Sequence, residues 1–206
     1  MLIKDIHLGC PSTDILKGLN EQLIQQLDKL APGKLISIKD LADSGLVKLG
    51  PSANPFVGGP TAKARLKKAI ETRDETLVVN SAYRTVAQQF LLWRIFHFGP
   101  PNNCGMAAVA NPGTSNHESG LALDIQNPFR WRLSLQTFGW KHLGPFDPPH
   151  YDFVGGTDLR QLGVKAFQSL WNQHNPSDKL EEPVDGLFGP ETRKRLEKTP
   201  IDGFGS

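Results

Sequence analysis

Cysteine is scarce in this 206-residue sequence: it has only Cys10 and Cys104. Neither lies in a CxxC motif, so the sequence has no cysteine-based zinc ribbon and no dithiol redox motif. The two thiols are compatible with one disulfide or with two free cysteines, and the sequence alone does not choose between them.

Long apolar runs and blocks of one charge are also missing. No stretch is long enough to cross a membrane, so no membrane span is expected. Residues 1–7 lack the basic start and apolar stretch of a secretory signal peptide, which leaves the export route open. Lysine and arginine number 23 against 21 aspartates and glutamates, a net charge of +2 without a basic block. This balance of charges gives no support to nucleic-acid binding. Separately, we expect the protein to be a monomer.

Glycine and proline are abundant, with 20 and 16 residues, and 38% of the sequence is hydrophobic. This composition is typical of a soluble protein with many loops and short elements. The length suits one sizeable domain, or a domain of about 150 residues with a small module. Because the chain changes character after Gly155-Gly156, we place a boundary near residue 156.

The apolar periodicity predicts an α+β fold, in which a small antiparallel sheet carries the motifs and helices flank it. A small helical module is expected at the C-terminus. Helices are predicted over 13–30, 62–72, 86–98, 130–140 and 159–171, with a last helix ending near 198. Strands are predicted over 35–38, 76–83 and 151–154, and loops over 44–60 and 99–114.

A candidate metal site comprises His117, Asp124 and His150. Two imidazoles and one carboxylate make a three-ligand zinc set that leaves a fourth position for water, as in catalytic sites. One zinc ion per chain is expected. Ligands scattered in sequence also arise by accident, so structural histidines are the alternative interpretation. His142 is the alternative ligand if His150 points elsewhere.

Three charged residues are candidates for the chemistry. Asp147 precedes His150 by three residues and two stiffening prolines, so it could act as general base and then general acid. The alternative is an ordinary turn aspartate. Glu118 is the rival acid, but in an extended segment its position next to His117 would point it away from the metal. Arg84, at the end of an expected strand, could bind a substrate carboxylate or polarise a carbonyl, or be a surface arginine.

Three motifs occur in a fixed order between residues 76 and 154. They are Ser81-Ala82-Tyr83-Arg84, Ser115-x-His117-x-x-Gly120-x-Ala122-x-Asp124 and Asp147-x-Pro149-His150-Tyr151. Together they resemble the motifs of the D-alanyl-D-alanine carboxypeptidase/dipeptidase family of zinc peptidases. That family includes vancomycin-resistance D,D-peptidases and phage L-alanyl-D-glutamate endopeptidases. The resemblance implies a hedgehog/D,D-peptidase-like α+β fold.

The resemblance also implies roles for individual residues. Zinc would lie on His117, Asp124 and His150, with Asp147 as the catalytic acid/base and Arg84 at the substrate. Further substrate-binding positions would be Ser115, Gln88, Tyr83 and Trp140. The resistance-type enzymes usually have glutamate where this chain has Asp147, and aspartate there is more like the endolysin-type branch. The choice of bond is therefore open.

The C-terminal segment resembles part of a small three-helix peptidoglycan-binding domain, through the stretches 164–168 and 184–192. It covers only about 40 residues, so the first helix of such a module is missing or substituted. A structural helical appendage is the alternative. The sequence thus predicts a zinc peptidase domain over 1–156, with 1–60 as scaffold and 76–154 carrying the motifs, and a peptidoglycan-binding-like module over 157–206.

The function implied is hydrolysis of an amide bond in the peptidoglycan stem peptide, in the periplasm or the extracellular cell wall. The favoured activity is D-Ala-D-Ala carboxypeptidase, with zinc-activated water and Asp147 as general base and acid. An L-Ala-D-Glu or cross-link endopeptidase is the close alternative. The alternative from another class is a non-catalytic cell-wall-binding protein with structural zinc.

Overall fold

The computed structural model of the chain describes residues 1–205 and divides into two compact units. One, here called the helical unit, consists of Met1–Pro32, Thr85–Ser115 and the segment from Arg160 onward. The other, here called the sheet unit, consists of Gly33–Arg84 and Asn116–Leu159. Each unit is built from segments that are far apart in the sequence, and each has its own core of buried apolar side chains.

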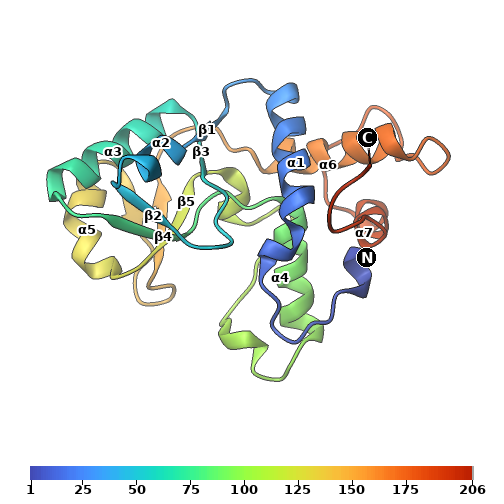
Figure 1. Cartoon of the computed structure of the whole chain (residues 1–206), viewed down its shortest axis with the longest axis horizontal. Helices are drawn as coiled ribbons and strands as arrows, with labels where there is room; N and C mark the ends of the chain where they lie inside the picture. The colour runs from blue at the N-terminus through green and yellow to red at the C-terminus, as the bar shows by residue number, and fades with distance from the viewer. Residues whose placement is uncertain (206) are drawn as a thin grey trace. The chain divides into compact units, whose positions relative to one another are not determined.

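All the strands of the described residues belong to the sheet unit (Figure 1). They are β1 (Leu35–Ser37), β2 (Val47–Leu49), β3 (Phe56–Gly58), β4 (Leu77–Ser81), β5 (Ala122–Ile125), β6 (Trp140–His142) and β7 (His150–Phe153). Five of them form a sheet in the order β2-β4-β5-β7-β6, while β1 and β3 pair separately. The predicted α+β class is confirmed, but the sheet is mixed, because β2 pairs with β4 in parallel.

Three helices accompany the strands of this unit: α2 (Lys39–Asp43), α3 (Pro60–Arg73) and α5 (Pro128–Thr137). Proline begins both longer helices, where its missing N–H costs nothing. The segment expected as a loop over 44–60 contains β2 and β3, and the helix expected over 130–140 ends before β6. These strands have three residues each, too few for a period of two to emerge from the sequence.

Side-chain alternation gives the sheet two different faces. On β5, Leu123 and Ile125 join the core that includes Ile70 of α3 and Leu135 of α5. Because successive side chains on a strand point to opposite faces, Asp124 lies on the face away from that core. The same alternation on β7 buries its apolar residues in the core and sends the polar ones to the face of Asp124.

A bulge in β4 changes which of its side chains reach this polar face. Val79 of β4 pairs with Ile125 of β5, and Ser81 of β4 pairs with Asp124 of β5. Between these two pairs β4 advances by two residues, whereas β5 advances by only one. Asn80 is therefore the extra residue of a β-bulge, a device that redirects the side chains following it. As a result, Ser81 lies on the same face as Asp124, and the chain continues into Arg84 from there.

The helical unit contains α1 (Lys17–Leu30), α4 (Val86–Phe98), α6 (Arg160–His174) and α7 (Pro190–Glu197). Helix α1 packs against α6, which it crosses (Figure 1). Helix α4 begins in a capping box, in which Thr85 Oγ1 accepts a hydrogen bond from Gln88 N and Gln88 Oε1 accepts one from Thr85 N. Cys10 and Cys104 form a disulfide within this unit, which answers the question that their spacing left open.

The C-terminal segment is part of the helical unit rather than a separate compact body, because Phe167 and Leu196 share a core with Leu19 and Phe90. The units therefore do not follow the linear division expected near residue 156. A role for residues 157–206 in wall binding stays a prediction. Within residues 1–205, no helix is long and apolar enough to span a membrane.

Gln168 of α6 organises the turn that follows Val184. Its Nε2 donates to Asp185 Oδ1 at 2.8 Å and to Thr192 Oγ1 at 3.0 Å, and its Oε1 accepts from Gly186 N at 2.7 Å. These bonds give the Asp185-Gly186 pair a structural role as a turn clamped onto α6.

Candidate metal centre and active site

The three predicted metal ligands lie together in the sheet unit. His117 comes from a 3-10 turn over Asn116–Ser119, Asp124 from β5 and His150 from β7. Their ligand atoms all lie within 4.8 Å of one another. Asp124 and His150 face each other as register partners on adjacent strands, and both histidines are buried.

His117 is held in one orientation by its backbone surroundings. Its Nδ1 lies 2.9 Å from the carbonyl oxygen of Ala82, and its Nε2 lies 3.1 Å from Asp124 Oδ2. A carbonyl oxygen only accepts hydrogen bonds, so Nδ1–H donates to it. Nε2 is therefore the ring nitrogen that faces Asp124 and the cluster.

Gly120 allows the turn carrying His117 to pass close to β3. Its φ of +76° lies in the left-handed region, and a Cβ there would lie 2.9 Å from Gly58 N. Gly58 N in turn donates to the carbonyl of Gly120 at 2.6 Å. Both the backbone conformation and the close approach require glycine at this position of the motif.

His150 faces the cluster with Nδ1, whereas His117 faces it with Nε2. Its Nδ1 lies 3.1 Å from Asp124 Oδ1 and 3.8 Å from Asp147 Oδ2. Its Nε2 lies 2.9 Å from Asp152 Oδ1, on the far side of the ring. The cluster is thus formed by Nε2 of one histidine, Nδ1 of the other and the Asp124 carboxylate.

The electrostatics of the metal-free cluster follow from burial and close pairing. Burial acts to raise the pKa of Asp124, but hydrogen bonds to both histidines outweigh it and hold the pKa far below the ordinary value. Burial acts to lower the pKa of His150, yet hydrogen bonds to Asp124 and Asp152 raise it to about 9. Burial and the nearby Arg84 cation lower the pKa of His117.

This donor set fits zinc. Zinc takes imidazole nitrogens and carboxylate oxygens, and catalytic sites use three protein ligands with one position kept for water or substrate. Here two imidazole nitrogens and one carboxylate converge, and at least His117 has its remaining nitrogen fixed by a protein acceptor. A fixed outer hydrogen bond is the usual accompaniment of a metal-binding histidine.

The two residues predicted to carry the chemistry lie beside the cluster. Asp147 Oδ2 is 3.8 Å from His150 Nδ1, and the Asp147 side chain is 48% exposed. Arg84 Nη2 lies 3.8 Å from Asp124 Oδ2 and donates to Ser81 Oγ at 3.1 Å. The sheet unit therefore gathers an accessible carboxylate and a guanidinium around the same three residues.

Other predicted site residues have a clear structural setting. Tyr83 and Trp140 are both buried, and Trp140 belongs to the core of the sheet unit. Burial and the charge of Glu118 raise the pKa of the Tyr83 hydroxyl. Ser115 and Gln88 belong to the helical unit, where Gln88 also donates to Thr13 Oγ1. Substrate contact by these four residues stays a prediction.

The two rejected candidates lie outside the ligand cluster. His142 Nε2 is 2.7 Å from the carbonyl oxygen of Pro148, and the ring packs against Tyr151. Glu118 is buried in the 3-10 turn and is not among the residues whose ligand atoms converge. The sequence argument placed Glu118 in an extended segment, whereas the structure has a 3-10 turn there.

Sequence reasoning missed the roles of Asn116 and Asp152. Asn116 Nδ2 lies 3.0 Å from both carboxylate oxygens of Asp152, which in turn contacts His150. A signal was present, because a residue two positions after His150 on a strand shares its face. The spacing of Asn116 and Asp152 gave no indication that they meet.

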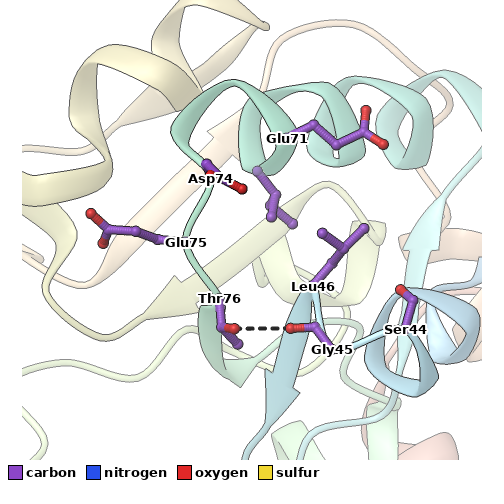
Figure 2. Close-up of a pocket in the computed structure, with 8 residues that line it drawn as sticks. Ser44, Gly45, Leu46, Glu71, Asp74, Glu75 and Thr76 are labelled. Carbon is purple, nitrogen blue, oxygen red and sulfur yellow. Dashed lines mark hydrogen bonds between the residues drawn. The ribbon is translucent and has the colours of Figure 1, made fainter.

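A pocket of about 260 Å³ elsewhere in the sheet unit is separate from the cluster. Figure 2 shows the acidic side chains of Glu71, Asp74 and Glu75 at its rim and the hydrogen bond from Thr76 Oγ1 to the carbonyl of Gly45. None of the residues that line this pocket belongs to the His117, Asp124 and His150 cluster.

Comparison with known proteins gives one family match. The family model described as D-alanyl-D-alanine carboxypeptidase, VanY, matches residues 60–142. Residues 60–142, less than half of the chain, are thus similar to the VanY family. The match supports the family predicted from the motifs and points to a peptidase that acts on peptidoglycan. No curated protein and no solved structure matches the chain.

The VanY match and the structure complement each other. The matched segment includes Arg84, His117 and Asp124 but ends before Asp147 and His150. These two residues come from the turn and strand that follow β6. The sheet register places His150 opposite Asp124, and Asp147 Oδ2 lies 3.8 Å from His150 Nδ1. The geometry thus brings two residues of the predicted site from outside the matched segment close to those within it.

Proposed function

We propose that the protein is a zinc-dependent peptidase that hydrolyses an amide bond of the peptidoglycan stem peptide, acting as a D-Ala-D-Ala carboxypeptidase. The observation that carries this proposal is the convergence of His117, Asp124 and His150 with the accessible carboxylate of Asp147 beside them. These three residues would hold one zinc ion. When bound, zinc supplies a Lewis acid and lowers the pKa of a coordinated water toward about 7.

Asp147 is suited to move the proton in this reaction. Its carboxylate is half exposed, so it can reach both solvent water and a bound substrate. Its backbone is fixed, because His150 N donates to the Asp147 carbonyl across the two prolines at 3.1 Å. We assign Asp147 the role of base toward the attacking water and then of acid toward the leaving amine.

Arg84 is suited to bind negative charge on the substrate. Its backbone N donates to the His117 carbonyl at 3.1 Å, and Ser81 Oγ accepts from its guanidinium. The cation is therefore held beside the ligand cluster by the same bulged strand that aligns Ser81 with Asp124. A guanidinium there favours a substrate with a terminal carboxylate, which a carboxypeptidase substrate has next to the scissile bond.

The Cys10–Cys104 disulfide supports action outside the cytosol. Disulfides persist in oxidising compartments, including the periplasm and the cell surface, and are rare in the cytosol. The Cys10–Cys104 bond is therefore consistent with action on the cell wall. We further propose that residues 157–206 contribute to wall binding and that the enzyme acts as a monomer.

Mass spectrometry of defined muropeptides tests the choice of bond. Zinc-loaded protein would be incubated with a stem pentapeptide, with a stem tetrapeptide and with a cross-linked dimer. We expect loss of one alanine from the pentapeptide only. Release of the stem at its L-alanine, or resolution of the dimer, would instead establish an endopeptidase. Binding of zinc and of wall without any product would establish a non-catalytic binding protein.

A further inference from the structure

We propose that Asp152 is a positioning residue that, together with Asn116, fixes the ring of His150 so that Nδ1 binds the metal. The inference rests on the proposed function, because it concerns the same zinc site. It adds two residues that are not among the three ligands, and one of them, Asp152, also lies outside the segment matched by the family.

The geometry at His150 distinguishes its two ring nitrogens. Asp152 follows His150 by two positions on β7, so both side chains lie on the polar face of the sheet. Asp152 Oδ1 lies 2.9 Å from Nε2, whereas Nδ1 faces Asp124 at 3.1 Å. An ionised carboxylate only accepts hydrogen bonds, so Asp152 keeps a hydrogen on Nε2, and Nδ1 is the nitrogen that would give up its hydrogen and bind the metal.

Asn116 holds the carboxylate of Asp152, which in turn contacts the ring of His150. Its Nδ2 lies 3.0 Å from both oxygens of Asp152, which restrains rotation of the carboxylate. Asn116 directly precedes His117, and Ser119 Oγ donates to its carbonyl at 2.5 Å. The Asn116–Asp152 pair therefore ties the turn that carries one histidine ligand to the strand that carries the other.

The two histidines differ in the chemistry of their outer partners. His117 donates from Nδ1 to the neutral carbonyl of Ala82, while His150 donates to a carboxylate. A carboxylate partner raises the basicity of the imidazole that it contacts and so strengthens its bond to a metal. His150 is therefore the ligand whose metal affinity depends on a replaceable side chain, and Asp152 is that side chain.

A zinc-binding titration of four variants tests this inference. Asp152→Ala removes the carboxylate, Asp152→Asn keeps its shape without the charge, and Asn116→Ala removes the restraint. Asp40→Asn is the matched control, because Asp40 is an exposed carboxylate of the same unit that pairs with Lys63 at 2.7 Å. Zinc dissociation constants would be measured by competition with a chelating dye, with circular dichroism as the check on folding.

We expect Asp152→Ala to weaken zinc binding about 10- to 100-fold. Asp152→Asn and Asn116→Ala should each weaken it by about 10-fold or less, and Asp40→Asn should not change it. If Asp152→Ala does not fold, the loss in Asp152→Asn relative to Asp40→Asn decides the question. Folded Asp152 variants that bind zinc as tightly as the wild type would overturn the inference.

Nitrogen-15 spectra of the histidine rings in the zinc-loaded wild type give a second readout that a purely structural role would not produce. We expect the hydrogen of His150 on Nε2 and the metal on Nδ1, and a mixture of coordination through both nitrogens in Asp152→Ala. Metal on Nε2 of the wild type would overturn the inference. Unchanged zinc affinity in the variants leaves the proposed function standing, whereas a wild type that binds no zinc overturns both.

Discussion

Asp124 Oδ1 lies 3.1 Å from His150 Nδ1, and the two residues are register partners on β5 and β7. Their separation is set by the backbone hydrogen bonds of two neighbouring strands. Because sheet ladders hold such pairs rigidly, two of the three proposed ligands would be in place before a metal binds. His117 alone depends on a turn, and the carbonyl of Ala82 fixes its ring.

Zinc binding should release a proton. Hydrogen bonds to Asp124 and Asp152, opposed by burial, raise the pKa of His150 to about 9, so its ring is charged near neutral pH in the metal-free protein. Asp124 is already ionised and His117 already neutral, because both of their pKa values are lowered. Zinc requires a neutral imidazole, so binding at about pH 7.5 should displace about one proton.

Calorimetry in two buffers of different ionisation enthalpy measures this number. We expect zinc affinity to rise with pH until the pH passes about 9. The same raised pKa stabilises the metal-free fold fully below about pH 6.5 and loses this effect as the pH rises through the folded value. Zinc binding that releases no proton at neutral pH would contradict the assigned protonation state.

Arg84 should be required for activity in a way that lysine does not replace. We expect Arg84→Ala to lower kcat/KM for a stem pentapeptide about 100- to 1,000-fold. The variant lacks the guanidinium, which would donate hydrogen bonds to the substrate carboxylate or to the negative charge that develops on the scissile carbonyl. Arg84→Lys should recover only part of this loss, since a point charge lacks the guanidinium fork. Arg65→Ala, an exposed arginine on α3, is the matched control.

A pentapeptide with a C-terminal amide identifies what Arg84 binds. If Arg84 binds the terminal carboxylate, the amidated substrate should be poor for the wild type and no poorer for Arg84→Ala. An Arg84→Ala variant that still discriminates fully between carboxylate and amide would assign carboxylate recognition to another residue.

Gly120→Ala should destabilise the fold more than Gly33→Ala. Both glycines have positive φ, at +76° and +70°, so both substitutions incur backbone strain of about 1–2 kcal/mol. Only at Gly120 would the added Cβ meet backbone, at 2.9 Å from Gly58 N, while nothing lies within 4 Å at Gly33. Urea unfolding should show a further loss of about 1 kcal/mol or more at Gly120. Equal losses would mean that the turn relaxes away from β3.

Removal of the disulfide should destabilise the helical unit. The bond joins residues 94 positions apart, and a disulfide restricts the unfolded chain. We expect the Cys10→Ser/Cys104→Ser double variant to lose about 2–4 kcal/mol in unfolding free energy. Reduction of the disulfide in the wild type should lower the midpoint of thermal unfolding as much as the double substitution does. If neither the substitution nor the reduction lowers this midpoint, the disulfide contributes no stability.

Long periodic elements were predictable from the sequence. The helix expected over 86–98 has those bounds, because its apolar face is continuous and Thr85 and Gln88 form a capping box. The convergence of His117, Asp124 and His150 was also predictable, since their residue types are distinctive and the motif order is specific. Their role as metal ligands stays a prediction. The helix expected over 130–140 extended too far, because it included Trp140, the first residue of β6.

Other features of the fold depend on contacts between residues far apart in the sequence, which local sequence patterns do not predict. The bulge at Asn80 appears only in the pairing of Val79 and Ser81 with β5. The sharing of one core by Leu19 and Phe167 likewise depends on packing between distant segments. For the same reason, the contact of Asn116 with Asp152 required the fold.

The most direct test of the account compares pentapeptide hydrolysis by zinc-loaded wild type and Asp147→Ala, with zinc content measured in the same samples. We predict that the variant binds zinc as the wild type does, because Asp147 is not a ligand, yet hydrolyses the substrate about 100- to 10,000-fold more slowly. Undiminished hydrolysis by zinc-loaded Asp147→Ala would contradict the assignment of Asp147 as the group that moves the proton.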